Sequence, residues 1–529
     1  MNHSTMKRAN PMTRLLPTLL VGLTLLLTAT AFAATPGITG PTFNLTATPA
    51  FITQPDGSAV YSWGYGCSVA PSGFAPSAIT PTTNPNVKCP TMQVPGPTLI
   101  VTQGQSVTVN LTNSLPAAAG NTSILFPGFD VTSSTGAGTE RGVLTQEATP
   151  GGTVTYTFTA STPGTRSYYS GTKGDLQIEM GLYGAIIVLP STIPAPCTSG
   201  LHTSNLTAQA HWGETDFRLA PAAYNHAGAC YDREYLFQFS EIDPVIHRLA
   251  EEQASRTCSG CMSVPTEPYH PAYFMINGRS MPDDMDPNYA IQYPHQPYNG
   301  NPHMHPGELV LLRIIGQGRW QHPFHEHGNH VRVLARDGNL ITSATDPNSL
   351  AGPLLFTTTT TPGQAMDGIY YWTGKGLNWD PYGHNPASSD PLAKLPCTPD
   401  ANGYNTGAPT AINYFEWCQD HNKPVQAAPF GDVGSGGPVT LPDPNIFANG
   451  PWFGGSPYLG PNATGRAVGA TGTTPPSGTI ANSPTDEAGF AFMWHSHNER
   501  EITTNNIFPG GMLMMMLVDS REFVIDESN

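Results

Sequence analysis

The stretch Gln321-His-Pro-Phe-His-Glu-His-Gly328 carries three histidines within six residues. It follows an apolar run, Leu309-Val-Leu-Leu-Arg-Ile-Ile315, that has the composition of a buried strand. Side chains alternate between the two faces of a strand, so His325 and His327 are expected to point the same way. The stretch therefore predicts a pair of imidazoles on one face of a β-sheet.

A second histidine pair, His495-Ser-His497, follows the apolar segment Phe490-Ala-Phe-Met-Trp494. The same alternation places both of its imidazoles on one face. If the two strands meet, four imidazoles meet with them. Imidazole is a ligand for copper, zinc, iron and nickel, and copper binds most tightly among the divalent ions of that row. The two pairs together predict a metal site.

The composition favours an all-β protein. Gly and Pro number 55 and 53, about a fifth of the 529 residues, against about 12% in average usage. Only 11% of residues are charged. Such a chain is typical of short strands joined by Gly/Pro turns. The formal net charge of −16 argues against a nucleic-acid partner, because phosphates require a basic surface.

The first 33 residues have the pattern of an export signal. Lys7 and Arg8 form a positive start, residues 15–27 are largely apolar, and Ala31-Phe-Ala33 has the form of a cleavage site. No later run reaches the roughly 18 apolar residues of a membrane span. The mature chain is therefore expected in the periplasm or the extracellular medium, with no membrane span.

Export places the eight cysteines in an oxidising compartment. Their proximity in sequence predicts four disulfides, although eight cysteines allow about 105 connectivities. The predicted pairs are Cys67–Cys89, Cys197–Cys230, Cys258–Cys261 and Cys397–Cys418. The C-x-x-C spacing of the third pair occurs in redox and zinc motifs. A structural disulfide in a loop is favoured, because no second C-x-x-C completes a zinc site.

Alternating or apolar segments between turns predict two successive β-domains. One helix is predicted over residues 245–256, with Asp243 as its N-cap and Pro244 at its first position. Residues 34–90 carry few periodic segments. Strands are predicted near residues 94–101, 106–112, 153–158, 167–169, 184–189, 233–239, 309–315 and 509–518.

Three phrases of the first half recur in the second half in the same order, which suggests one β-sandwich used twice. They pair residues 102–111 with 306–315, 149–152 with 361–364, and 180–188 with 509–518. The second copy is interrupted by residues 373–488, which are dense in Pro, Gly, Asn and Thr. A loop of this length is unusual inside a domain, so it is interpreted as a surface insertion stapled by its own cysteine pair.

The motifs resemble those of multicopper oxidases, which are built from cupredoxin domains. The resemblance covers roughly residues 92–190, 229–372 and 489–519, and its most specific phrase is His322-Pro-Phe-His-Glu-His-Gly328. Supporting phrases are Val94-Pro-Gly-Pro-Thr98, Gly181-Leu-Tyr-Gly184 and Phe274-Met-Ile-Asn-Gly278.

The resemblance implies an all-β fold of two cupredoxin-like Greek-key β-sandwich or barrel domains, as in the two-domain members of that family. Those relatives place their copper cluster between the subunits of a trimer, so a homotrimer is one expectation. The expected organisation is a signal peptide at 1–33, a first domain at 34–198, a linker at 199–228, and a second domain at 229–529 with the insertion at 373–488.

The family's copper ligands carry over one residue at a time. Its H-P-x-H-x-H phrase assigns His322 to the type 1 copper, His325 to the type 2 copper and His327 to a type 3 copper. Both histidines of its closing H-C-H phrase are type 3 ligands, here His495 and His497. The resemblance thus implies these five histidines as metal ligands.

Several other ligands of the family are replaced in this chain. The type 1 cysteine is Ser496, whose neutral hydroxyl is a poor substitute for a soft thiolate, and the second type 1 histidine is Glu501. The first-domain H-W-H-G and H-S-H phrases are Leu125-Phe-Pro-Gly128 and Tyr169-Ser-Gly171. Met512 matches the last type 1 ligand only across an insertion.

These replacements bear on the reaction. Four-electron reduction of dioxygen in the family needs a type 1 centre and three further coppers, so laccase-type activity is not expected. Copper nitrite reductases, also built from two cupredoxin domains, need a type 1 cysteine in their first domain. No cysteine lies between Cys89 and Cys197, so that alternative fails as well.

Three functions remain open. The first is a reduced site, in which the His325, His327, His495 and His497 imidazoles bind one copper or zinc ion, assisted by Glu499 or Glu501, for redox or Lewis-acid chemistry. The second is a copper-free scaffold or interaction protein of the cell envelope. The third is a copper carrier that uses His303-Met-His305 and the methionines of residues 512–516. The simpler interpretations of that third set are solvated histidines and a buried strand.

Overall fold

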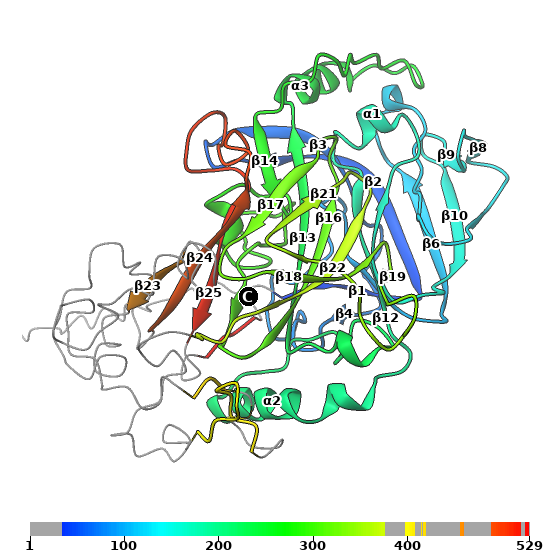
Figure 1. The fold of residues 1–529 in the computed structure, drawn as a ribbon. Coiled ribbons are helices and arrows are strands. Elements are labelled where there is room, and N and C mark those ends of the chain that lie inside the picture. The colour runs from blue at the N-terminus through cyan, green and yellow to red at the C-terminus, as the bar shows by residue number, and fades with distance from the viewer. Residues whose placement is uncertain are drawn as a thin grey trace, which may run out of the picture.

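The computed structural model describes residues 34–375, 397–407, 414, 416–418, 455–459, 488–519 and 524–527. They form two β-sandwiches that pack against each other (Figure 1). The predicted export signal and most of the predicted insertion lie outside the described residues. The fold is all-β, as predicted.

The first sandwich consists of two five-stranded sheets. One sheet has the order β11 (Gly164–Tyr169), β12 (Tyr183–Leu189), β5 (Leu99–Thr102), β1 (Gly37–Thr39) and β4 (Phe74–Ala75). The other has the order β3 (Ala59–Cys67), β2 (Thr42–Thr53), β6 (Ser106–Asn113), β10 (Thr153–Thr159) and β7 (Thr132–Ser133). A separate hairpin pairs β8 (Thr139–Arg141) with β9 (Gln146–Ala148).

The second sandwich has a seven-stranded and a six-stranded sheet. The first of these has the order β14 (Tyr273–Ile276), β13 (Arg233–Ile242), β16 (Leu309–Gly316), β22 (Ala365–Tyr371), β18 (Val331–Arg336) and β19 (Asn339–Leu340), with β20 (Leu354–Leu355) also beside β18. The other has the order β15 (His303–Met304), β25 (Leu513–Asp519), β24 (Ala488–Ser496), β17 (His322–Glu326) and β21 (Thr357–Thr360), with β23 (Gly455–Leu459) also beside β24.

The two sandwiches repeat one topology. In the first, β2 runs parallel to β6, which is antiparallel to β10. In the second, β13 runs parallel to β16, which is antiparallel to β22. Likewise β12 runs parallel to β5, and β25 runs parallel to β15. The three repeated phrases fall on β6 and β16, on the turns before β10 and β22, and on β12 and β25, so the predicted duplication is confirmed.

Short helices connect these strands. They are α1 (Gly174–Gln177), α2 (Leu201–Trp212), α3 (Pro244–Gln253) and the 3₁₀ turns η1 (Ala117–Ala119), η2 (Ala195–Thr198), η3 (Ala227–Ala229) and η4 (Asp283–Met285). Helix α3 begins as predicted, with the Asp243 side chain accepting a hydrogen bond from the Val245 backbone at 2.9 Å. It ends at Gln253, three residues before the predicted end.

The predicted linker at 199–228 contains α2, which the sequence analysis missed. Its buried side chains are mostly polar, so it lacks the apolar stripe of a helix that packs by hydrophobic burial. His202 and Asn205 bind the Asp232 carboxylate at 2.6 and 2.9 Å, and Gln209 donates to Glu308 at 2.6 Å. Hydrogen bonds from polar side chains therefore hold this helix in place. Such contacts produce no periodic pattern of apolar residues in the sequence.

Residues 34–90 carry few periodic segments in the sequence, yet β2 and β3 form a long antiparallel pair there. Glycines inside β3 obscure it in the sequence. A Cβ atom on Gly64 would lie 2.2 Å from the Gln93 carbonyl oxygen, and one on Gly66 would lie 2.2 Å from that of Pro90. These glycines therefore permit another segment to cross the strand closely.

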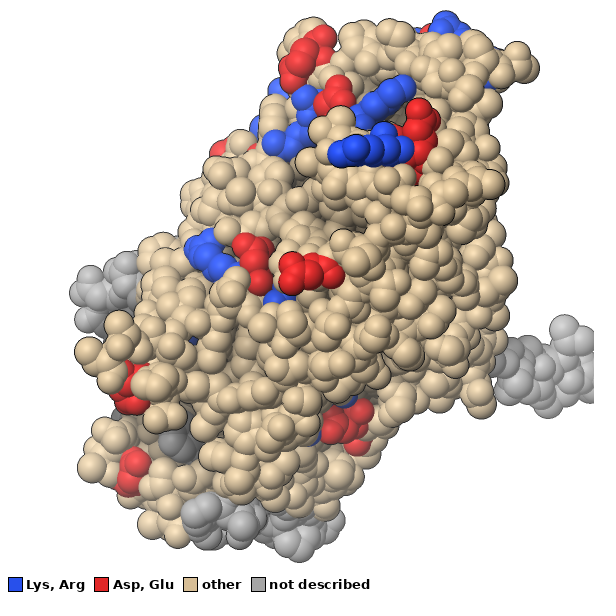
Figure 2. Space-filling model, turned by 90° about the vertical axis from the view of Figure 1, so that its right-hand side faces the viewer, with Lys and Arg blue, Asp and Glu red and all other residues tan. Residues whose placement is uncertain are grey.

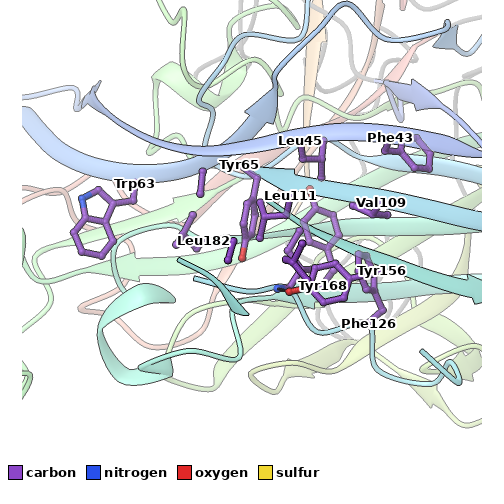
Figure 3. Close-up of a cluster of buried hydrophobic side chains, with 14 of the residues drawn as sticks. Phe43, Leu45, Trp63, Tyr65, Val109, Leu111, Phe126, Tyr156, Tyr168 and Leu182 are labelled. Carbon is purple, nitrogen blue, oxygen red and sulfur yellow. Dashed lines mark hydrogen bonds between the residues drawn. The ribbon is translucent and has the colours of Figure 1, made fainter. Parts of the chain in front are cut away.

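The core of the first domain is rich in aromatic side chains. Tyr65, Tyr156 and Tyr168 are fully buried, and Phe126 lies against the last two of these rings (Figure 3). Charged side chains are sparse on the face in Figure 2 and gather toward its upper end, where α1 and α3 lie in Figure 1. No helix among the described residues is long and apolar enough to cross a membrane.

All four predicted disulfides are present, which confirms the pairing by proximity. They join Cys67 to Cys89, Cys197 to Cys230, Cys258 to Cys261 and Cys397 to Cys418. The last of these staples residues of the predicted insertion, as expected. One described strand of that insertion, β23, extends the sheet beside β24.

A buried polar cluster joins the two domains. Asp367 on β22 accepts hydrogen bonds from the Thr165 hydroxyl at 2.6 Å and the Thr165 backbone at 3.1 Å, and also binds the Tyr224 hydroxyl. Arg313 lies 3.7 Å from the same carboxylate and pairs with Glu234 at 2.7 Å. Thr165 belongs to β11 of the first domain, so this carboxylate fixes one domain onto the other.

We expect Asp367→Ala to lower the free energy of unfolding by about 3–5 kcal/mol, because it leaves buried donors without their acceptor. Urea unfolding of the mature protein measures this loss. The matched control is Asp130→Ala, which removes an exposed carboxylate of a loop and should leave the unfolding midpoint unchanged. Equal midpoints for the two variants would contradict the role given to Asp367.

Candidate metal centre

The histidine pairs are brought together by two neighbouring strands. Strand β17 carries His325 and leads directly to His327, and β24 carries His495 and leads to His497. The strands pair antiparallel with His325 opposite His495 (Figure 1). Directly opposed residues of an antiparallel pair have their Cβ atoms about 4.5–5.5 Å apart. The register itself therefore clusters the imidazoles.

The four rings form one cluster, in which His325 and His495 each lie beside the other three. The ring centroids of His325 are 4.8 Å from His327, 5.6 Å from His495 and 4.9 Å from His497. Those of His495 are 5.2 Å from His327 and 5.5 Å from His497. The structure thus gathers all four, although the two pairs lie about 170 residues apart in the sequence.

One pair of nitrogen atoms has the spacing of two ligands on one ion. His327 Nε2 lies 3.3 Å from His495 Nε2. Zinc–imidazole bonds are about 2.0–2.1 Å long, so two nitrogens on one such ion lie at most about 4 Å apart. The spacing of these two nitrogens therefore fits two ligands of one metal ion.

Hydrogen bonds from the outer ring nitrogens orient two of the imidazoles. His495 Nδ1 donates to the Ser496 carbonyl at 2.7 Å, which leaves the lone pair of its neutral ring on Nε2. His325 Nδ1 is hydrogen-bonded to the Thr357 hydroxyl at 2.7 Å. Partners of this kind fix ring orientation in metal sites.

The cluster favours neutral imidazoles. Burial lowers the pKa of His325 to about 4, and charge on the three neighbouring imidazoles adds to that effect. Burial also lowers the pKa of His495. Neutral imidazole is the form that binds metal ions. Both rings are therefore ready for coordination at neutral pH.

The four imidazoles lie close together but do not form a complete coordination site. Across the part of the chain that the structure describes, no group of three or more His, Cys, Asp and Glu side chains converges on one point as a finished metal site does. His497 is exposed, and exposed side chains change rotamer on the picosecond-to-nanosecond scale. A third ligand would therefore have to come from a turn of such a ring.

His322 lies elsewhere, in a buried acidic pocket. Its Nε2 is 2.9 Å from a Glu241 carboxylate oxygen and its Nδ1 is 2.9 Å from Oε2 of Glu501. The Ser496 hydroxyl donates to that same Oε2, and Asn498 donates to the other oxygen at 2.8 Å. Both ring nitrogens of His322 are occupied by carboxylates, so neither is open to a metal ion.

The backbone of Met512 adjoins the same pocket. Its side chain is fully buried. Its carbonyl accepts from the Ser496 backbone at 2.9 Å, and its own N–H donates to the Glu501 carbonyl at 2.8 Å. Of the four residues that correspond to type 1 ligands, His322 and Ser496 therefore meet at Oε2 of Glu501, and Met512 adjoins them through its backbone. With no thiolate and both imidazole nitrogens taken, these side chains do not fit a type 1 copper.

The pocket has a marked effect on protonation. Burial disfavours the charged imidazole of His322, but its hydrogen bonds to Glu241 and Glu501 outweigh burial and raise its pKa to about 9. Glu241 also accepts from the Arg319 and Trp320 backbones at 2.6 and 2.9 Å. The pocket thus holds a protonated imidazole between two carboxylates.

The acidic network continues into the first domain. The Tyr269 hydroxyl lies 3.2 Å from Glu241 and donates to Glu179 at 2.7 Å. Glu179 also accepts from the Asp243 backbone at 2.7 Å. Burial raises the pKa of Glu179 to about 8. A chain of buried polar groups therefore runs from the His322 pocket to the domain boundary.

The first-domain positions of the family ligands hold Leu125, Pro127, Tyr169 and Gly171, all half-buried. Leu125 and Tyr169 form a β-bridge. Phe126 is 4% exposed and packs on Tyr168, whose hydroxyl donates to the Pro97 carbonyl at 2.7 Å (Figure 3). These aromatic side chains adjoin the ligand positions, and none of the four positions themselves carries an imidazole.

The expectation that His303 and His305 are solvated is wrong. His303 is 2% and His305 is 1% exposed. His303 Nδ1 binds Asp519 at 2.6 Å, and His305 Nε2 binds Glu214 at 2.5 Å. Acidic groups from distant parts of the chain face them, which the local sequence does not reveal. The methionines of residues 512–516 belong to or adjoin β25, as predicted for a buried strand.

Sequence reasoning missed two side chains that shape these sites. Glu241 stands in a strand whose ten residues are all buried, and an acid in such a strand is the one available signal. Thr357 begins a run of five threonines, residues 357–361, that suggests only a strand. Glu501, expected as an additional metal ligand, instead binds His322, Ser496 and Asn498.

Comparison with known proteins agrees with these observations. Residues 76–192 and 265–368 each match a family model described as multicopper oxidase. An L-ascorbate oxidase of Brassica rapa subsp. pekinensis is 38% identical over 96 residues, which is 18% of this chain and 16% of that protein. This chain therefore matches that relative over only a small part of its length.

Solved structures with a similar fold include the multicopper oxidase mgLAC, at 15% identity and a TM-score of 0.42, covering 90% of this chain and 86% of that one. A blue copper oxidase from Nitrosomonas europaea has 14% identity and a TM-score of 0.42, with 90% and 85% covered. Duplicated sandwiches with histidine pairs on adjacent strands define a cupredoxin-type protein. The chain belongs to the multicopper oxidase family.

We expect Ser496→Cys alone not to create a blue copper centre, because the Glu501 carboxylate still fills the pocket. Ser496→Cys combined with Glu501→His supplies a thiolate and frees His322 Nδ1, so this double variant should gain intense thiolate-to-copper absorption when copper is added. Visible absorption spectra of the copper-loaded proteins test this. A blue single variant, or a folded but colourless double variant, would contradict the pocket's assignment.

The raised pKa of His322 predicts a pH-dependent stability. The imidazole gains protons on folding, so its contribution is fully present below about pH 6.5 and is lost as pH rises through about 9. Urea unfolding of the parent and of His322→Gln at several pH values isolates this contribution. The difference between them should shrink between pH 6 and pH 9.5 by about 3 kcal/mol. A difference independent of pH would contradict the charged triad.

Proposed function

We propose that this protein is an exported member of the multicopper oxidase family that binds a single metal ion, preferentially copper, at the His325, His327, His495 and His497 cluster. The observation that carries the proposal is the 3.3 Å approach of His327 Nε2 to His495 Nε2. Two further imidazoles adjoin that pair. The four disulfides are consistent with the periplasm or the extracellular medium.

The donor set favours copper over other ions. Imidazole suits both copper and zinc, and copper binds more tightly by the usual order of affinities. A copper ion bound there would supply one-electron redox chemistry. The residues of the chain hold its ligands: Thr357 orients His325, and the Ser496 carbonyl orients His495. With the type 1 pocket occupied by Glu501, we expect no laccase-type reduction of dioxygen.

A copper-free scaffold is the second candidate, and one observation favours it. The type 1 position has become a self-contained ion network in which His322 takes the positive charge. Such a pocket is stable without metal. The copper carrier is disfavoured, because His303 and His305 are buried in ion pairs.

Metal content per chain tests the proposal. The mature protein, loaded with copper or zinc and dialysed, should retain about one equivalent of copper and exchange zinc for it. The variant His325→Ala/His497→Ala should retain none. His330→Ala is the matched control, because it removes a neighbouring histidine outside the cluster. Less than about a tenth of an equivalent of either metal in the parent would contradict the metal site and support the copper-free scaffold. Two or more equivalents would point to other ligands, such as His384 and His421, which lie outside the described residues.

The pH dependence of binding gives a second readout. Because the pKa of His325 is about 4, copper affinity should persist well below pH 6.5, the ordinary pKa of free imidazole, and fall only toward pH 4–5. Competition titrations with a chelator of known affinity measure this. Loss of copper already near pH 6.5 would show that the buried His325 does not control the binding.

A further inference from the structure

The disulfide between Cys258 and Cys261 differs from the other three in where it lies. Cys258 is exposed and Cys261 is half-buried. Each other disulfide has at least one cysteine that is at most 5% exposed, namely Cys67, Cys197, Cys230 or Cys418. Only this bond, among the four, joins a cysteine that is exposed. Figure 1 shows its loop crossing the top of the molecule after α3.

The bond also closes by far the shortest loop. Its cysteines are 3 residues apart, against 22, 33 and 21 in the other pairs. The stabilisation that a disulfide provides by restricting the unfolded chain grows with the length of the closed loop. This bond therefore contributes least to the stability of the fold.

Other contacts already hold the loop in place. At its base, Gln253 donates to the Ser263 carbonyl at 2.8 Å and accepts from the Ser263 backbone at 2.9 Å. Along its length, Gly260 and Met262 donate to the Ala117 and Ala118 carbonyls at 2.9 and 2.8 Å. Met262 is buried in the core of the first domain. The loop would thus keep its place with the disulfide open.

Two basic side chains lie near the loop. Lys173 Nζ lies 3.4 Å from the Ala119 carbonyl, on the 3₁₀ turn against which the loop docks. Arg256 stands two residues before Cys258. Of the acids on α3, Glu252 is paired with Arg248 and Glu251 lies farther back on the helix. Neighbouring cations lower the pKa of a thiol and promote disulfide exchange.

We infer that Cys258–Cys261 is a redox-active disulfide that exchanges with dithiol reductants, separately from the histidine cluster. A thiolate of the dithiol attacks the exposed Cys258 sulfur, and the Cys261 sulfur leaves as a thiolate and takes up a proton. The second thiol of the reductant then displaces Cys258 from the mixed disulfide. The protein gains two electrons and two protons, and the reductant becomes a cyclic disulfide.

Selective reduction of the mature, folded protein tests this inference. In graded dithiothreitol, with thiol alkylation and peptide mass spectrometry, Cys258 and Cys261 should become alkylated at a dithiol concentration about tenfold below that needed for the other six cysteines. Reoxidation should restore the bond, with the circular dichroism spectrum unchanged throughout. Reduction of all four bonds together, or of this bond last, would overturn the inference.

Variants separate a redox role from a structural one. Cys258→Ser/Cys261→Ser should keep the thermal midpoint of the parent, whereas the matched variant Cys67→Ser/Cys89→Ser should lower it. With oxidised glutathione, Cys261→Ser should form a mixed disulfide at Cys258, and Cys258→Ser should form far less at the half-buried Cys261. Equal losses of thermal midpoint in the two double variants, or preferred attack at Cys261, would also overturn the inference.

Discussion

The antiparallel pairing of β17 with β24 is the constraint on which both sites depend. Its register sets Phe324 opposite Ser496 and His325 opposite His495. Because side chains alternate along a strand, one face of the pair carries Phe324, Trp494 and Ser496 into the core, and the other carries the histidine cluster. A slip of one residue would exchange the two faces. One register thus separates the His322 pocket from the four imidazoles.

The two sites have opposite electrostatic character. In the cluster, burial and mutual repulsion keep His325 and His495 neutral, with a lone pair available for a cation. In the pocket, two carboxylates keep His322 protonated. The His322 imidazolium supplies positive charge at the position where the resemblance to multicopper oxidases implies a type 1 copper ion. Replacing one such group without the others leaves an uncompensated buried charge, which is strongly destabilising.

Much of this arrangement could be predicted from the sequence. The repeated phrases identified the duplicated sandwich, and the alternation in the two histidine pairs predicted which imidazoles face the same way. The disulfide pairs followed from proximity. In each case the information is local, because a short stretch determines its own periodicity or pairing.

Features set by contacts between distant segments could not be predicted. Helix α2 is held by hydrogen bonds to two distant acids. His202 and Asn205 bind Asp232, which lies 30 and 27 residues further along the chain. Gln209 binds Glu308, which lies 99 residues further along. His303 and His305 are buried by acids at positions 519 and 214. Glu241 reaches His322 across 81 residues. No local pattern encodes such pairs, so the sequence suggested solvated histidines and only a linker at 199–228.

The most direct test of the account is anomalous X-ray diffraction at the copper edge from crystals of the copper-loaded mature protein. A single metal site predicts one anomalous peak, at about 2.0–2.1 Å from Nε2 of both His327 and His495. No peak is expected in the pocket of His322, Ser496 and Glu501. A peak between His322 and Ser496, or well-ordered cluster imidazoles with no peak among them, would contradict it.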